Sequence, residues 1–252
     1  MALWSKRKQR QEMPPRCRQV PGGQVEVLSN MVFKAEHCLI AGTTGCGKST
    51  LLHGIMRDLL RSYSPEQVKL VLIDPKLVEL SRYRSLPHVV SYADTSKGAV
   101  EALRGVEREM MRRYEVMRSR GWDNWPGGLM FVVIDELAPL MLKTNPYRKE
   151  FQPLMQNILQ LGRASGIRVV AATQAPNRQV IPAELVLNFS MRIGMRCLSQ
   201  IESRQIIGSK GCELLPLHGR ALVVYGPEMR PAVLNNTDRA EVNEIIEYWK
   251  AV

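Results

Sequence analysis

The sequence has few of the features expected of a secreted, zinc-binding or membrane-spanning protein. Its five cysteines are scattered over 252 residues without a Cys-x-x-Cys pair, which argues against a zinc site and a disulfide framework. No apolar core follows the first charged residues, so no signal peptide is predicted. The most apolar stretch, residues 129–142, carries Asp135 and Glu136 at its centre and is too short to span a bilayer. We therefore expect a soluble, cytoplasmic chain with no membrane segment.

Acidic and aromatic side chains are also scarce. The chain has 24 Asp and Glu residues against 35 Lys and Arg, a formal net charge of +11, and only 6% of its residues are aromatic. Excess positive charge favours a polyanionic partner such as nucleic acid or an anionic membrane surface, although a basic protein can also be merely soluble. Residues 1–22 are basic and contain prolines. We expect them to form either a solvated flexible arm or an arm that binds nucleic acid.

Residues 23–252 alternate between apolar runs and amphipathic segments. After a hairpin-like stretch, strands are predicted at 36–42, 68–74, 89–93, 129–137, 167–174, 189–198 and 220–226, and helices at 51–62, 97–120, 147–163 and 240–250. The hairpin-like stretch before the first strand comprises residues 25–33. Apolar residues recur at steps of three and four in the longest helix, which predicts a core-facing stripe. We expect one α/β domain with a mainly parallel sheet flanked by helices.

A phosphate-binding loop follows the first apolar strand. Residues 42–49 read Gly-Thr-Thr-Gly-Cys-Gly-Lys-Ser, which fits the pattern G-x-x-x-x-G-K-[ST] of P-loop nucleoside triphosphatases. In this context the backbone N–H groups at a helix N-terminus surround phosphates. Lys48 is expected to reach the β- and γ-phosphates of ATP and the Ser49 hydroxyl to bind Mg²⁺. The predicted nucleotide-binding residues are Gly42, Thr43, Thr44, Gly45, Cys46, Gly47, Lys48, Ser49 and Thr50.

Polar residues at the ends of two later strands complete the predicted chemistry. The run FVVIDE ends in Asp135 and Glu136, which we interpret as the Mg²⁺-binding carboxylate and the general base that activates water. Both acids could instead cap a helix at the strand end. The run VVAATQ ends in Gln174, a candidate for sensing the γ-phosphate or orienting water.

Longer strings resemble the motor domain of the FtsK/SpoIIIE family of DNA translocases, within the wider FtsK–HerA class. They include AGTTGCGKS at 41–49, IDPKLVELSRYRSLPHVV at 73–90, FVVIDELAPLM at 131–141 and LGRASGIRVVAATQAP at 161–176. The IDPK-x-x-EL and GRASGIR strings are much more specific than the loop alone. The resemblance covers the chain from about residue 37 to the carboxyl terminus.

The resemblance implies a RecA-like ATPase that forms a hexameric ring around duplex DNA and moves along it by ATP hydrolysis. Nucleotide would lie between subunits, and an arginine from the neighbouring subunit would stabilise the transition state. Arg192 is the favoured match for that role, with Arg163 and Arg204 as competitors; each could instead form an ordinary ion pair. Arg204 and Lys210, in the region that resembles the pore loop, are the candidates for contacts with the DNA backbone.

The chain departs from the family pattern in several places. Ala175 stands where the family often has arginine, so any role of that arginine is missing or falls to Arg178. Cys46 replaces a common serine, and a thiol at a helix N-terminus is expected to be reactive. The sequence carries no membrane-spanning region before the motor and no winged-helix module after it. These features favour a small translocase of a plasmid, phage or integrative element, with a relaxase, replication or packaging protein as a possible partner.

Other functions remain open at this point. One alternative is a conjugative coupling or packaging ATPase that acts on single-stranded DNA or a DNA–protein complex. Another is an ATP-binding switch that does not translocate. The low aromatic content favours duplex DNA, because proteins that bind single strands stack bases on aromatic side chains. An ABC-type ATPase is not indicated, because no LSGGQ-like signature precedes residues 131–136.

Overall fold

The computed structural model describes residues 31–33, 35–178, 180–234 and 237–251. The predicted basic arm, residues 1–22, lies outside these residues, as does most of the hairpin-like stretch. The end of that stretch, 31–33, is helical, with the Ala35 N–H donating to the Met31 carbonyl at 3.1 Å. The expectation of an extended chain there is therefore wrong for these three residues.

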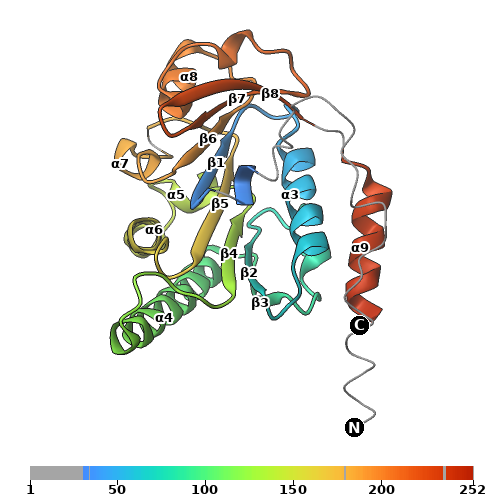
Figure 1. The fold of residues 1–252 in the computed structure, drawn as a ribbon. Coiled ribbons are helices and arrows are strands. Elements are labelled where there is room, and N and C mark those ends of the chain that lie inside the picture. Colours follow the sequence, from blue (N-terminus) through green and yellow to red (C-terminus); the bar gives the residue numbers. More distant parts are fainter. Residues whose placement is uncertain (1–30, 34, 179, 235–236, 252) are drawn as a thin grey trace.

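One eight-stranded sheet organises the described part of the chain (Figure 1). Its strands are β1 (His37–Ala41), β2 (Val68–Ile73), β3 (Val89–Ala93), β4 (Leu129–Ile134), β5 (Ile167–Thr173), β6 (Met191–Gly194), β7 (Arg220–Tyr225) and β8 (Glu228–Val233). The spatial order is β3-β2-β4-β5-β1-β6-β7-β8. All pairings from β3 to β6 are parallel, and those of β7 and β8 are antiparallel. The predicted mainly parallel sheet is confirmed.

Helices cover both faces of the sheet (Figure 1). They are α3 (Lys48–Ser62), α4 (Ser96–Arg120), α5 (Ala138–Met141), α6 (Arg148–Leu161), α7 (Ala183–Val186), α8 (Gln200–Ile207) and α9 (Arg239–Ala251), with short 3₁₀ turns η3 (Ser81–Tyr83) and η4 (Cys212–Leu214). No helix among the described residues is long and apolar enough to cross a bilayer.

Strand β4 shows how the sheet separates two hydrophobic cores. Phe131 and Val133 pack with α3 and α9 on one face, whereas Val132 and Ile134 pack with α4 and α6 on the other. Successive side chains of a strand point to opposite faces, so a strand buried on both sides must be apolar throughout. This requirement explains the continuous apolar runs in the central strands.

The stripe predicted on the longest helix is part of the second core. Its members in that core are Val100, Leu103, Val106 and Met110, and Met117 further along the helix is also buried. The helix begins after Thr95, whose side-chain oxygen accepts from the Gly98 N–H at 3.0 Å, and ends at Gly121 in the left-handed conformation, φ 67°. A polar N-cap and a C-terminal glycine are the usual end signals of an α-helix.

The antiparallel edge of the sheet was only partly predicted. Strand β7 matches the predicted strand at 220–226, but β8 was not expected, because EMRPAV contains a proline and lacks a continuous apolar run. Most of β8 is exposed, so its sequence carries little of the burial pattern that marks the central strands.

Candidate functional site

The phosphate-binding loop connects β1 to α3 at the carboxyl edge of the parallel strands. The Gly42 N–H donates to the Thr173 carbonyl at 3.3 Å, and the Thr43 N–H donates to the Arg196 carbonyl at 2.7 Å. The loop is therefore held from both sides, by the end of β5 and by the segment after β6. Both supports come from residues more than 120 positions later in the chain.

Glycine is required at two positions of the loop for different reasons. A Cβ on Gly42 would lie 2.8 Å from the Met195 Cβ and 2.9 Å from the Cys46 Sγ, so a side chain has no space there. Gly47 has φ 101° and is the N-cap of α3, a backbone conformation that only glycine adopts without strain. The loop geometry thus matches the predicted pattern.

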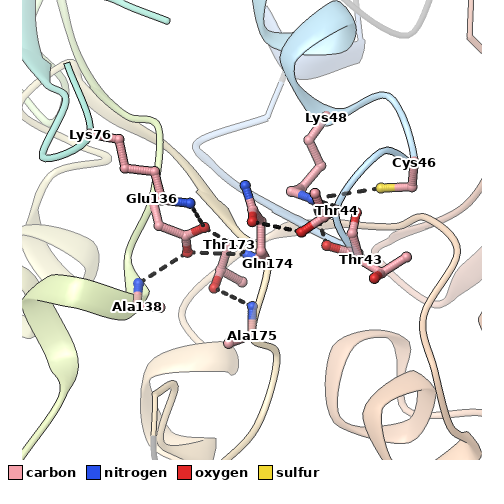
Figure 2. Close-up of polar contacts among 11 residues, drawn as sticks. Thr43, Thr44, Cys46, Lys48, Lys76, Glu136, Ala138, Thr173, Gln174 and Ala175 are labelled. Carbon is pink, nitrogen blue, oxygen red and sulfur yellow. Dashed lines mark hydrogen bonds and ion pairs between the residues drawn. The ribbon is translucent and has the colours of Figure 1, made fainter. Parts of the chain in front are cut away.

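Lys48 points back into the loop (Figure 2). Its Nζ donates to the carbonyls of Gly42 at 2.6 Å and Thr43 at 2.8 Å, and the side chain is only 7% exposed. Burial lowers the pKa of this ammonium group, while Cys46 and Glu136 act in the opposite direction. A buried cation at the start of a helix is a suitable partner for a phosphate.

The Cys46 thiol lies beneath the loop. It is 1% exposed, 3.7 Å from the Lys48 Nζ and 3.9 Å from the Met195 Sδ. Reagents therefore have no access to this sulfur in the described conformation. The expectation of a reactive thiol is wrong for this conformation, because the residue packs as a small apolar side chain.

Glu136 follows β4 and is buried, with 1% of its surface exposed. Its Oε1 accepts from the backbone N–H groups of Ala138 and Gln174, both at 3.1 Å. Its Oε2 accepts from the Gln174 N–H at 3.1 Å and from the Lys76 Nζ at 3.3 Å. Figure 2 shows these donors converging on one carboxylate.

Lys76 belongs to the loop after β2, within the IDPK-x-x-EL string. The side chain of Asp74, which is fully buried, accepts from the Leu80 N–H at 2.9 Å, and its carbonyl accepts from the Leu77 N–H at 3.1 Å. These bonds close the loop on itself and direct Lys76 toward Glu136. Sequence reasoning did not identify either Asp74 or Lys76 as part of the site, although the run VKLVLID ends in an acid just as FVVIDE does.

Asp135 lies among other acids. Burial raises its pKa to about 7, and the nearby charges of Asp74, Glu79 and Glu136 add to that rise. The backbone N–H of Asp135 donates to the Ile73 carbonyl at 3.1 Å, so the ends of β2 and β4 are in register. The chain thus gathers negative charge at the ends of two neighbouring strands.

Gln174 connects the acidic strand end to the phosphate-binding loop (Figure 2). Its backbone N–H bonds Glu136, and its side-chain Oε1 accepts from the Thr44 Oγ1 at 2.9 Å. This contact lies at the solvent-exposed surface of the site. Arg178 lies further along the same segment and is exposed.

A histidine on α3 forms an unpredicted contact beside the acids. The Nε2 of His53 lies 2.9 Å from the Glu79 Oε2, and its Nδ1 lies 2.8 Å from the Tyr83 hydroxyl. Ser49 and His53 are four residues apart on α3 and share one face of the helix. The interaction fixes the segment after β2 against the helix that carries Lys48.

The candidate arginines and the candidate DNA contacts lie apart from one another. Arg192 is on β6 next to β1, and burial of its half-exposed side chain lowers the pKa of the guanidinium. Arg204 on α8 and Lys210 just after it are exposed. Arg163 lies at the opposite, amino edge of the sheet, where its Nε is 3.2 Å from the Glu36 Oε1. Arg163 therefore already has an ion-pair partner in its own chain.

The residues present fit a nucleotide and Mg²⁺. A buried Lys48 ammonium suits phosphates, and the acids that raise the pKa of Asp135 suit a divalent cation. Within the described residues, no group of three or more His, Cys, Asp and Glu side chains could hold a metal ion by itself. Mg²⁺ at nucleotide sites takes one or two protein ligands together with phosphate oxygens and water. The Ser49 hydroxyl and Asp135 are the side chains that could provide them.

The FtsK/SpoIIIE family model matches residues 3–129, which is half of the chain. The chain belongs to the FtsK/SpoIIIE family. A DNA translocase FtsK of Agrobacterium fabrum is 35% identical over 265 aligned positions, which cover 86% of this chain and 29% of that protein. The FtsK/SpoIIIE chain described here thus spans under a third of the length of that relative. The family match includes residues 3–36, which the resemblance noted in the sequence did not cover.

Solved structures with the same fold are P-loop ATPases. The pCW3 conjugation coupling protein TcpA, solved as a monomer with ATPγS, has a TM-score of 0.74 at 23% identity, covering 84% of this chain and 64% of that one. The cytoplasmic domain of the Thermomonospora curvata type VII secretion ATPase EccC has a TM-score of 0.70 at 24% identity, covering 85% of this chain and 28% of that one. This FtsK/SpoIIIE member therefore has the RecA-like P-loop ATPase fold.

Proposed function

We propose that this chain is the ATP-hydrolysing motor domain of a DNA translocase that works as a hexameric ring on double-stranded DNA in the cytoplasm. One observation carries the proposal above others. The buried Glu136 carboxylate at the end of β4 is linked through Gln174 to Thr44 of the phosphate-binding loop. A general base joined to the loop in this way can respond to the bound nucleotide.

The proposed roles follow from the positions of the side chains. Lys48 binds the β- and γ-phosphates, and Ser49 and Asp135 hold Mg²⁺, which supplies electrostatic stabilisation of phosphate charge when bound. Glu136 accepts a proton from the attacking water. Gln174 orients that water or detects the γ-phosphate through its contact with Thr44.

The roles between subunits and toward DNA rest on charge and exposure. Arg192, half-buried and with no ion pair among the described residues, is proposed to act on the nucleotide of a neighbouring subunit. Arg204 and Lys210 are exposed beside α8 and are proposed to contact DNA phosphates. The net charge of +11 supports a polyanionic partner whose sequence is not read.

A second candidate function is a coupling or packaging ATPase that acts on single-stranded DNA or a DNA–protein complex. The fold shared with the conjugation coupling protein TcpA favours it. Either of these two functions could serve DNA transfer or packaging for a plasmid, phage or integrative element. A relaxase, replication or packaging protein would then be the partner. The third candidate function is a switch that binds ATP without moving DNA.

The deciding experiment measures ATP turnover with no DNA, with duplex and with single strands, together with the mass of the assembled complex. A duplex motor raises its turnover most with duplex and has the mass of six chains. Preference for single strands supports the second candidate, and turnover that ignores DNA supports the switch.

Two variants test the site assignment in the same assay. Lys48→Ala should abolish hydrolysis, whereas Glu136→Gln should retain ATP binding and lose turnover. Unchanged turnover in either variant would refute the role proposed for that residue.

A further inference from the structure

Three donor groups surround the Glu136 carboxylate in this conformation. A carboxylate offers about four acceptor positions, two on each oxygen. The Ala138 N–H donates to Oε1, the Lys76 Nζ donates to Oε2, and the single Gln174 N–H is shared by both oxygens, all between 3.1 and 3.3 Å. A base must accept a hydrogen bond from the water that it activates. Because both oxygens are already contacted by donors, that water must compete with one of them for Glu136.

The donors differ in how easily they can leave. Ala138 begins α5, and Gln174 directly follows β5, so moving either backbone N–H would disturb the fold around it. Lys76 is a side chain on a loop and is 38% exposed, against 2% for the Glu136 side chain. Water can therefore reach this amine from the solvent side. The Lys76 amine is thus the donor that can withdraw and leave one lone pair of Oε2 for water.

The loop that carries Lys76 is built so that its tip can move. Asp74 fixes the far end of the loop through its bond to the Leu80 N–H, and only one backbone bond, from the Leu77 N–H to the Asp74 carbonyl, crosses the tip. At the tip, Leu77 has φ 59°, a left-handed conformation that is unfavourable for a leucine. The Leu77 and Val78 side chains are 58% and 61% exposed, so little packing holds the tip in place.

From these contacts we infer that Lys76 is a positioning residue that blocks Glu136 and must withdraw before water can be activated. The inference rests on the proposed role of Glu136 as general base. Lys76 then limits the rate of hydrolysis in the absence of DNA, and a conformational change of the loop tip at 76–78 couples DNA engagement to turnover. The IDPK string, which the family resemblance alone does not explain chemically, thereby acquires a chemical role.

The test compares Lys76→Met, Lys76→Arg and the control Lys149→Met, which changes an exposed lysine at the start of α6. Lys76→Met should raise DNA-free turnover roughly twofold to fivefold, because it removes a half-exposed ion pair from the base. The factor by which DNA raises the turnover of this variant should be correspondingly smaller than in the wild type. Lys76→Arg keeps a donor and should behave as the wild type, as should the control. Binding of a fluorescent ATP analogue should be unchanged in all three.

A second measurement requires neither nucleotide nor turnover. Acetylation of Lys76, followed by mass spectrometry in nucleotide-free protein, should be several times faster in Glu136→Gln than in the wild type, while acetylation of Lys149 is equal in both. Equal acetylation of Lys76 would refute the contact in solution.

The kinetic results separate the inference from the function on which it rests. Full turnover in Glu136→Gln would overturn the assignment of the base, whatever Lys76 does. Loss of turnover in Glu136→Gln with unchanged or lower DNA-free turnover in Lys76→Met would overturn the blocking role alone. Analogue binding weakened tenfold in Lys76→Met would show instead that Lys76 binds nucleotide.

Discussion

Acidification should destabilise this protein through one buried histidine. His37 begins β1, the strand that leads to the phosphate-binding loop, and it is 2% exposed. Its Nδ1 accepts from the Val169 N–H at 3.1 Å, which requires that nitrogen to be unprotonated. Burial lowers the pKa of His37 to about 4, with Glu36 acting to raise it and Arg168 to lower it further.

The direction and size of the effect follow from linkage between protonation and folding. An unfolded histidine has a pKa of about 6.5, so the unfolded chain takes up a proton first as the pH falls. The contribution of neutral His37 to the free energy of unfolding is therefore present in full above about pH 6.5 and is lost as the pH falls toward 4. The full shift of the His37 pKa corresponds to about 3 kcal/mol in the free energy of unfolding, and about 2 kcal/mol of this is lost between pH 7 and pH 5.

The assay is urea denaturation of the wild type and His37→Asn at both pH values. The asparagine side-chain oxygen can still accept from the Val169 N–H, but it does not titrate. The pKa values of His53 and His88 are also lowered by burial, so both proteins should lose stability on acidification. Between pH 7 and pH 5, the free energy of unfolding of the wild type should fall by about 2 kcal/mol more than that of the variant. Equal losses in the two proteins would refute the reasoning.

Three further predictions concern the site and its partners. Gln174→Ala, which removes the contact with Thr44, should slow single-turnover hydrolysis by roughly ten- to a hundredfold with little change in analogue binding; parallel losses in both would instead indicate a binding role. Mixing inactive Arg192→Ala and Lys48→Ala chains should restore part of the ATPase activity, because each supplies the group that its neighbour lacks, and no recovery at any ratio would argue against action between subunits. Arg204→Ala should weaken DNA binding equally for all sequences and reduce the slope of log affinity against log salt by about one; an unchanged slope would exclude this phosphate contact.

The sequence predicted the parallel part of the fold well, because burial on both faces demands continuous apolar runs. The runs at 68–74, 129–137 and 167–174 became β2, β4 and β5. The predicted helix at 97–120 begins one residue earlier and ends as expected, at Arg120. These elements carry their own end signals, a polar residue at the strand end or a cap at the helix end.

The contacts around Glu136 could not be predicted in the same way. Lys76 lies 60 residues before its partner, and nothing local in the string IDPK indicates which acid it will face. Similarly, the segment that resembled a pore loop contains the helix α8, which begins after Ser199 with a side-chain cap on the Glu202 N–H. Such features depend on which strands become neighbours, and a sequence alone does not give the strand order.

The strand order has a consequence for synthesis of the chain. Strand β1 is completely buried between β5 and β6, pairing His37 with Val169 and Cys38 with Met191. Both partners are made more than 125 residues later, so a nascent chain cannot pair this apolar strand until most of the domain has left the ribosome. At roughly 5–20 residues per second, that wait lasts several seconds or more. ATP binding should therefore appear late and abruptly during translation, and chains that stop before β6 should depend on chaperones.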